Sequence, residues 1–164
     1  MRIGLLPMGP VPAPLLAQLA RELAAYGLAA EILPDAEVPP GAFDRRRGQH
    51  RAEALLPRQA TPTLAVTTVD LYTEGLNFVF GLANAGSGGA VVSLFRLSTA
   101  DHDLLLARLV KEGAHELGHT WGLGHCEDAA CVMHFSDSLA EADAKGRRFC
   151  ATCRRSLPES VRTP

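Results

Sequence analysis

The stretch HELGHTWGLGHC, residues 115–126, constrains the fold of this chain more than any other. His115 and His119 are four residues apart, so on a helix their imidazoles lie on one face and can reach a single ion. Glu116 is rotated by about 100° from His115, which suits a residue that holds a water better than a third ligand. We therefore expect a helix that carries a metal site on one face.

The residues after this helix complete the metal site. Gly122 is placed to end the helix with a positive φ, so that the chain reverses and brings His125 to the same ion. Three histidines with an open fourth position are typical of catalytic zinc, which lowers the pKa of its water to about 7. Glu116 can then take the proton and pass it to a leaving amine. The motif predicts hydrolysis of peptide bonds by attack of zinc-bound water.

The apolar pattern predicts that the motif helix runs from about residue 101 to 121, capped by Ser98 or Thr99. One apolar stripe at three- and four-residue steps is formed by Leu106, Val110, Ala114, Leu117 and Trp121. The histidine face is separate from this stripe and also carries Arg108, Lys111 and Glu112. We therefore expect that face to look into a cleft, with the apolar stripe packed on a sheet.

The rest of the chain alternates between strand-like and helix-like segments, which predicts an α/β layer. Strands are expected at residues 1–9, 29–33, 63–72, 76–83 and 90–97, and further helices at 14–27 and 46–56. The glycine-rich NAGSGG, residues 84–89, predicts a hairpin between the last two strands. The basic run Arg46, Arg47 and Arg51 fits a solvated helix face, or alternatively a phosphate contact.

All four cysteines follow the histidine motif, as C-x4-C and then C-x2-C. They are Cys126, Cys131, Cys150 and Cys153. Two short chelating hooks suit a closed, structural zinc site, with an iron–sulfur cluster or disulfides as the alternatives. Structural zinc contributes about 10–16 kcal/mol in zinc-finger peptides. Without this zinc, the loop that holds His125 should loosen.

Length and charge limit the partners. With 164 residues we expect a single domain, in which residues 1–122 end with the motif helix and residues 123–164 form a zinc-stabilised C-terminal part. The net charge of −2 gives no overall attraction to nucleic acid or to a membrane surface. A zinc ribbon that uses Arg147, Arg148, Arg154 and Arg155 to contact nucleic acid is the weaker alternative. No export signal is read at the N-terminus, so we expect the protein in the cytoplasm. We also expect a monomer, and the two ligand motifs predict two zinc ions per chain.

The segments HELGHTWGLGHCEDAACVM and FCATC together resemble the archaemetzincins, a branch of the metzincin zinc peptidases. VTTVDLYTEGLNFVFGLA and AVVSLFRL resemble that family's strands. The resemblance implies a compact α/β (α+β) domain with a mixed, twisted sheet packed on the active-site helix. It also implies that Met133 forms the Met-turn, an apolar floor beneath the metal. The family's edge strand, here residues 77–84, would bind an extended peptide by β-addition.

The predicted function is therefore that of a zinc metallopeptidase acting on peptides or small proteins, with Glu116 as general base. Trimming of peptide N-termini, which the family suggests, would require a carboxylate to hold the substrate amine, and the sequence offers Asp70 and Glu74. The alternative function is a catalytically silent, zinc-stabilised module that binds peptides.

Overall fold

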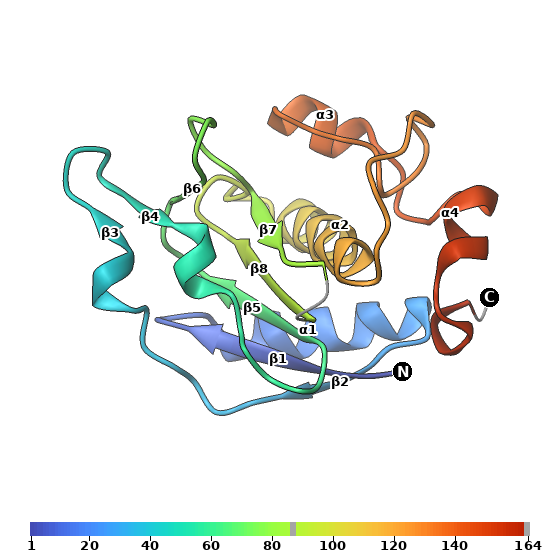
Figure 1. Cartoon of the computed structure of the whole chain (residues 1–164), viewed down its shortest axis with the longest axis horizontal. Coiled ribbons are helices and arrows are strands. Elements are labelled where there is room, and N and C mark those ends of the chain that lie inside the picture. The colour runs from blue at the N-terminus through green and yellow to red at the C-terminus, as the bar shows by residue number, and fades with distance from the viewer. Residues whose placement is uncertain (86–87, 163–164) are drawn as a thin grey trace.

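The computed structural model describes residues 1–85 and 88–162. Its centre is a five-stranded sheet in the order β2-β1-β5-β8-β7 (Figure 1). The strands are β1 (Arg2–Met8), β2 (Ala29–Ile32), β5 (Thr63–Thr67), β7 (Gly81–Ala83) and β8 (Gly89–Ser93). All pairs are parallel except β7–β8, which is antiparallel and places β7 at one edge. The expected mixed sheet and the hairpin are confirmed, although residues 86 and 87 of the NAGSGG turn lie outside the described residues.

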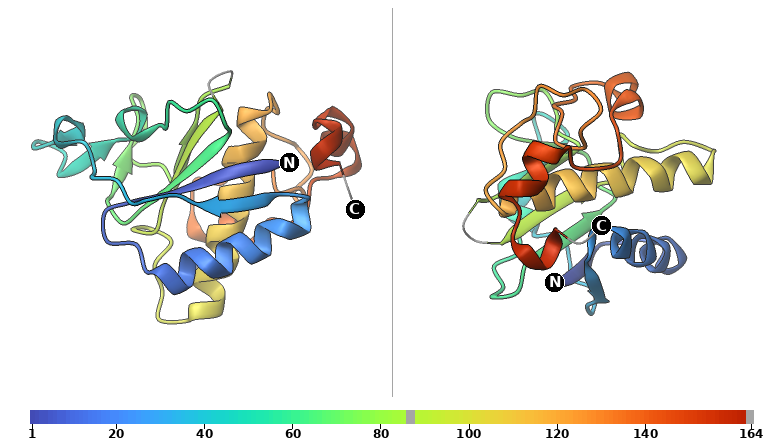
Figure 2. Two further views of the ribbon diagram at one scale, coloured as in Figure 1. Left: turned by 90° about the horizontal axis from the view of Figure 1, so that it is seen from below. Right: turned by 90° about the vertical axis from the view of Figure 1, so that its right-hand side faces the viewer.

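Two helices cover one face of this sheet, α1 (Ala13–Leu23) beneath β1 and β2, and α2 (His102–Thr120) beneath β7 and β8 (Figures 1 and 2). Strand periodicity divides the core, because Leu64 and Val66 pack toward the helices while Ala65 packs on the opposite face. Both faces of the central strands are therefore buried, as a mostly parallel sheet requires. Among the described residues, no helix is both long and apolar enough to cross a bilayer.

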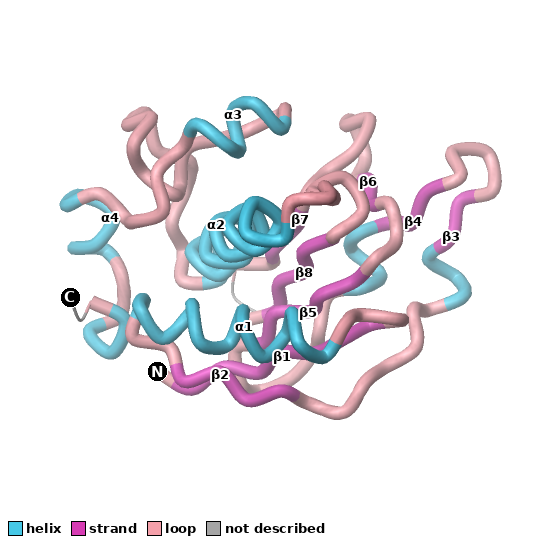
Figure 3. Tube along the Cα trace, turned by 180° about the vertical axis from the view of Figure 1, so that it is seen from behind, coloured by secondary structure: helices cyan, strands magenta, loops and turns pink. Residues whose placement is uncertain are grey.

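A second, three-stranded sheet in the order β3-β4-β6 lies beyond the helix-free face, visible from behind in Figure 3. It consists of β3 (Phe43–Asp44), β4 (Gln49–Arg51) and β6 (Leu71–Tyr72), flanked by the 3-10 turns η2 (Pro40–Ala42) and η3 (Ala52–Leu55). The predicted helix over residues 46–56 is therefore wrong. Gly48 has a φ of 68°, and the Asp44 carboxylate accepts the amide hydrogens of Arg46 and Arg47, which favours a hairpin turn over a helix.

Three predicted strands differ in the structure. The segment expected as one strand at 63–72 forms β5 and, in the second sheet, β6. The segment expected as a strand at 76–83 is a strand only at β7, and the one at 90–97 ends with β8 at Ser93. The aromatic residues Phe78 and Phe80 favour a half-buried surface, and here that surface is the wall of a cavity beside the sheet. The apolar pattern therefore indicated a half-buried surface correctly, but residues 76–80 form a loop and not a strand.

Helix α2 begins and ends close to the prediction. Its N-cap is Asp101, whose side chain accepts the amide hydrogen of Leu104 at 3.1 Å, so a cap at Ser98 or Thr99 is wrong. An aspartate at the position that directly precedes the helix satisfies the free amide, and the earlier hydroxyls lie too far back. At the other end, Gly122 has the expected positive φ of 85°.

The C-terminal part packs on the side of α2 that carries the charged residues. It contains α3 (Leu139–Ala144), α4 (Ala151–Ser156) and the turn η4 (Glu159–Val161). The Arg108 guanidinium binds the Asp143 carboxylate through two hydrogen bonds of 2.7 and 2.6 Å. The buried Lys145 ammonium lies 2.9 Å from the Glu112 carboxylate. The histidines of this face look into a cavity, as expected, and Glu112 also lines it. Arg108 and Lys111 do not line it and instead bind residues 143 and 145.

Candidate active site

Helix α2 brings His115 and His119 together, and the turn after it adds His125. The Nε2 atoms of His115 and His119 are 3.0 Å apart, and one ring nitrogen from each of the three histidines lies within 4.8 Å of the others. Two nitrogens bound tetrahedrally to one zinc at about 2.1 Å would be roughly 3.4 Å apart. The cluster could therefore hold one metal ion with only small movements of the rings.

Hydrogen bonds to the main chain fix two of these rings. The Nδ1 atom of His115 lies 2.9 Å from the carbonyl oxygen of Val132, and Nδ1 of His119 lies 2.8 Å from that of Leu123. A carbonyl oxygen can only accept a hydrogen bond, so Nδ1 carries the proton and Nε2 keeps its lone pair for a metal. Burial lowers the pKa of His115 to about 3 and also lowers that of His119, which keeps both imidazoles neutral.

The methionine predicted beneath the metal is fully buried against α2. A Cβ added to Gly118 would overlap the Met133 sulfur, so only a glycine lets the methionine approach the helix between the two histidines. The loop that carries Met133 is joined to the histidine turn by a hydrogen bond of 2.9 Å from the Cys126 amide to the Met133 carbonyl. The neighbouring His134 turns to the Cys126 carbonyl, at 2.9 Å.

A cavity of about 680 Å³ opens beside the histidines. One side is formed by residues 76–80, which we call the cavity wall, and by β7; the other sides are α2 and residues 135–137. The cavity wall contributes Leu76, Phe78 and Phe80, and Phe135 lies opposite, with its ring centroid 4.9 Å from that of His125. The space and its apolar lining suit a peptide side chain.

Glu116 lies on this cavity and is 6% exposed. Burial raises its pKa well above the usual range, the Glu112 carboxylate raises it further, and the Lys145 ammonium opposes both. A Cβ at Gly81 of β7 would lie 2.6 Å from Glu116 Cγ, so the carboxylate packs directly on the edge strand. A carboxylate with a raised pKa is a better proton acceptor near neutral pH.

The four cysteines form the second cluster, and their sulfur atoms all lie within 4.8 Å of one another. The sulfurs of Cys126 and Cys150 are 3.8 Å apart, close to the roughly 3.8 Å separation of two thiolates bound tetrahedrally to zinc at about 2.3 Å. A disulfide would require about 2.05 Å. The main-chain amide of Cys153 lowers the pKa of Cys150 to about 7. The donor set therefore fits a metal better than a disulfide.

The two carboxylates suggested for binding a substrate amine do not lie on the cavity. Asp70 is bound by Arg96 and Gln49, and Glu74 is outside the cavity lining. The exposed carboxylate on the cavity is instead Asp137, which the sequence did not indicate because nothing in its neighbourhood predicts which way the loop turns. The sequence also gave no sign of the Glu112–Lys145 pair.

Three convergent imidazoles and a buried carboxylate on a cavity beside a sheet edge define the class of the protein as a metal-dependent peptidase. The chain matches the model of Peptidase family M54 over residues 47–159. An archaemetzincin of Methanopyrus kandleri is 47% identical over 133 residues, which cover 77% of this chain and 76% of that protein. This chain belongs to the archaemetzincins, peptidase family M54, and is a zinc metallopeptidase.

Solved structures agree with this assignment. The archaemetzincin of Archaeoglobus fulgidus, complexed with malonate, superposes with a TM-score of 0.88 at 38% identity, covering 96% of this chain and all of that one. A zinc-dependent peptidase of Methanocorpusculum labreanum gives a TM-score of 0.87 at 34% identity, with coverages of 95% and 100%. The resemblance and the fold class expected from the sequence are confirmed.

Proposed function

We propose that the chain hydrolyses peptide bonds, with His115, His119 and His125 as the ligands of a catalytic zinc and Glu116 as the general base. The convergence of the three imidazoles beside one buried carboxylate carries the proposal. When bound, zinc polarises the scissile carbonyl and makes water more acidic. The polypeptide must then supply a base, a binding strand and a space for the substrate side chain.

Glu116 is suited to be that base. It faces the cavity, and its burial raises its pKa, so it can accept a proton from the attacking water and return it to the leaving nitrogen. Strand β7 lies at the sheet edge on the same cavity, which supports binding of the substrate as an extended strand. The geometry supports a metzincin-type arrangement in which one residue moves the proton in both directions.

We assign the cysteine cluster a structural zinc, which gives two ions per chain. Its four sulfurs come from two segments, residues 126–131 and 150–153, and together they close the coordination sphere. Residues 1–164 would then act as one catalytic domain whose C-terminal part is held to α2 by the metal and by buried charges. Elemental analysis of the dialysed protein should find two zinc ions per chain.

Trimming of peptide N-termini is the finer activity that we propose. Asp137 lines the cavity and is exposed, and its hydrogen-bonding contact with the Glu141 carboxylate raises its pKa. A substrate ammonium would offset the repulsion between these two carboxylates. Peptides with a free amine should therefore be cleaved faster than their acetylated forms, and Asp137→Asn should reduce that difference.

The Glu116→Gln variant tests the catalytic assignment. Its zinc content and its peptide affinity should stay at the wild-type level, while kcat should fall by about 10²–10⁴-fold, the usual contribution of a general base. His119→Ala should instead lose one of the two zinc ions. Unchanged turnover in Glu116→Gln would reject the mechanism, and peptide binding without turnover in the zinc-loaded wild type would favour the silent binding module.

A further inference from the structure

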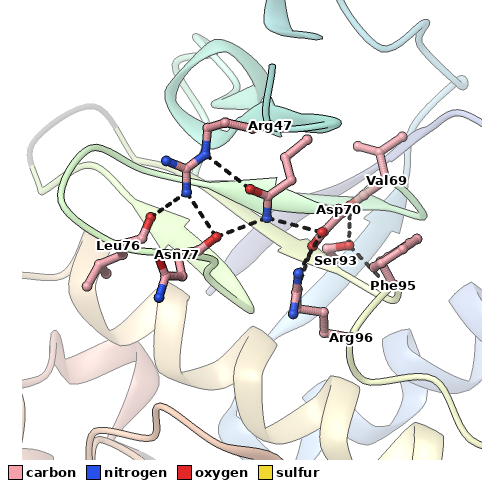
Figure 4. Close-up of polar contacts among 9 residues, drawn as sticks. Arg47, Val69, Asp70, Leu76, Asn77, Ser93, Phe95 and Arg96 are labelled. Carbon is pink, nitrogen blue, oxygen red and sulfur yellow. Dashed lines mark hydrogen bonds and ion pairs between the residues drawn. The ribbon is translucent and has the colours of Figure 1, made fainter. Parts of the chain in front are cut away.

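Four polar side chains on the far side of the cavity wall form one connected group, which we call the polar clamp: Arg47, Gln49, Asp70 and Arg96. They come from the β3–β4 hairpin, from the turn before β6 and from the segment after β8. Figure 4 shows this group reaching the main chain of Leu76 and Asn77. The mechanism above uses none of its members.

The clamp holds the cavity wall by its main chain. Arg47 Nη2 donates to the carbonyl oxygens of Leu76 at 2.9 Å and Asn77 at 3.1 Å. Gln49 Nε2 donates to the same Asn77 oxygen at 3.0 Å. Because carbonyl oxygens are the acceptors, these bonds fix the path of the wall and do not depend on its side chains.

The clamp side chains also fix one another. Arg96 binds Asp70 through two hydrogen bonds of 2.6 and 2.8 Å, and Gln49 Nε2 donates to Asp70 Oδ2 at 3.1 Å. Arg47 Nε donates to Gln49 Oε1 at 3.1 Å. Gln49 is buried, and the Asp70 side chain is 11% exposed. Two-bond arginine–carboxylate pairs of this kind are rigid as well as strong.

The aromatic rings of the wall are held by the same group. The Arg96 guanidinium lies 4.2 Å from the centroid of the Phe78 ring, and Phe78 in turn meets Phe80 edge to face at 5.3 Å. Both phenylalanines line the cavity. A planar guanidinium can stack on a ring in a way that an ammonium cannot reproduce.

The cavity wall has little regular structure of its own. The Leu76 amide donates to the Thr73 carbonyl at 3.2 Å, the Val79 amide to Leu71 at 3.0 Å, and the Phe80 carbonyl accepts the Ser93 amide hydrogen at 2.8 Å. The carbonyls that the clamp binds, those of Leu76 and Asn77, make none of these main-chain bonds. Main-chain bonds hold the end of the wall at Val79 and Phe80, whereas the carbonyls of Leu76 and Asn77 are held by side chains from outside it.

We propose that the polar clamp is a positioning device that fixes the cavity wall, so that the Phe78 and Phe80 rings form a preset site for one large apolar side chain of the substrate. This proposal rests on the proposed function and adds to it a substrate class and the residues that set it. The small sheet β3-β4-β6 then supports specificity, while the proposed proton transfer is the task of Glu116 on α2.

The test uses hexapeptides of alanine in which a single phenylalanine is scanned through the positions, with hexa-alanine as reference. For Arg96→Ala, the KM of the best phenylalanine peptide should rise by about tenfold, within the range by which apolar pockets discriminate. Its kcat, and the KM of hexa-alanine, should change less than about twofold. Arg96→Lys keeps the charge but loses the planar stack, so it should restore only part of the preference.

Two controls separate the clamp from general stability and from the catalytic proposal. Arg147→Ala removes an exposed arginine–glutamate pair of 2.7 Å to Glu22 that lies away from the cavity, and it should leave the preference unchanged. Titration calorimetry of both peptides with the zinc-loaded Glu116→Gln protein, with and without Arg96→Ala, measures the preference without turnover. Absence of cleavage by the wild type would reject the proposed function alone, since the calorimetry still measures the clamp.

Two outcomes would overturn the proposal. One is an equal loss for both peptides in Arg96→Ala, which would indicate a general effect on folding. The other is a preference that Arg96→Ala leaves intact. If Arg96→Ala does not fold, Phe78→Leu removes the stacked ring and keeps the Asp70–Arg96 pair. It should lower the phenylalanine preference by a similar factor, and an unchanged preference would overturn the proposal equally.

Discussion

Gly81 and Gly118 show how closely the backbone approaches the catalytic side chains. At Gly118 a Cβ would overlap the Met133 sulfur, and at Gly81 it would press on Glu116. Neither glycine has a positive φ, so conformational freedom is not the reason for them. The absence of a side chain is what these positions require, because it lets the edge strand and the methionine loop pack directly on α2.

Gly81→Ala should therefore impair catalysis, and its contact with the main chain of β8 should also lower stability. Its Cβ would lie 2.6 Å from both Glu116 Cγ and the Val91 carbonyl oxygen, so the carboxylate must move. A displacement of about 1 Å at a catalytic group can cost about 10²-fold, and we expect that order of loss in kcat with zinc content unchanged. Gly41→Ala is the matched control, because no atom lies within 4 Å of the added carbon. Equal kcat in the two variants would contradict this prediction.

At the scale of single residues, the sequence predicted the positions that spacing determines. His115 and His119 converge because residues four apart lie on the same face of a helix. Gly122 has the positive φ that allows the chain to turn toward His125. The clamp could not be predicted because the contacts that assemble it at the wall join residues 20 or more positions apart, and Asp137 could not because its place depends on the path of a loop. Local rules do not determine such contacts.

Helix α2 is buried on two sides, and its second contact is with the C-terminal part. The charged side chains Arg108, Lys111 and Glu112 are each at most 7% exposed, although a helix face of this composition normally faces water. They bind residues 143 and 145 instead. Helical periodicity predicted that face and the cleft beside its histidines correctly, but it could not predict that Arg108 and Lys111 bind the C-terminal part, since a charged face gives no sign of its polar partner.

Lys145→Met tests this contact. The Lys145 and Glu112 side chains are 1% and 4% exposed, so removing the ammonium leaves a buried carboxylate without its counterion. Breaking a buried pair in this way typically costs about 3–5 kcal/mol, measured here by urea unfolding. Adding Glu112→Gln should restore part of the loss. The exposed Arg147–Glu22 pair serves as control, and Arg147→Met should change the free energy of unfolding by less than about 1 kcal/mol.

The Arg108–Asp143 pair also joins α2 to the C-terminal part, and its contribution to stability should be lost in acid. Hydrogen bonds from Arg108 lower the pKa of Asp143 in the folded protein below its ordinary value of 3.8. Its stabilisation is therefore complete above that ordinary value and is lost as the pH falls through the lowered folded pKa. The difference in unfolding free energy between wild type and Asp143→Asn should be constant near pH 6 and shrink below about pH 4. A difference that grows on acidification would refute this assignment.

At the scale of whole elements, turn chemistry outweighed apolar pattern where the sequence prediction was wrong. Residues 46–56 have the composition of a helix, but Asp44 and Gly48 close a hairpin at their start. The resulting small sheet carries Arg47 and Gln49 to the cavity wall. Because residues 46–56 were predicted as a helix, the contacts of Arg47 and Gln49 with the cavity wall could not be predicted. The five-stranded sheet and both long helices were predicted closely enough to locate the site.

For the whole molecule, the cysteine cluster joins segments that would otherwise be separate. Residues 126–131 and 150–153 meet there, and the Val132 amide bonds to the Arg148 carbonyl at 2.9 Å beside it. The same segment supplies the Val132 carbonyl that orients His115. Loss of the cysteine-bound metal should therefore affect the histidine site as well as stability.

Cys153→Ser should lose one zinc ion and weaken retention of the other. Structural zinc contributes about 10–16 kcal/mol in isolated fingers, comparable with the roughly 5–15 kcal/mol that stabilises a whole domain. We expect a large fall in thermal stability, together with faster removal of the remaining ion by a chelator. Calorimetric unfolding and elemental analysis measure the two effects. A variant that retained the histidine-bound ion as firmly as the wild type would show that the two sites are independent.

His125 and Cys126 are joined by one peptide bond, yet they belong to different clusters, and the second cluster is complete only with Cys153. During synthesis the histidines of α2 leave the ribosome well before that last cysteine. Main-chain bonds from the Leu123 amide to Gly118 and from the Cys126 amide to Met133 hold the turn of the third imidazole, and under the two-zinc proposal the cysteine cluster would anchor it further. A nascent chain would thus gain the last anchor of its histidine site late, after residues 150–153 have been made.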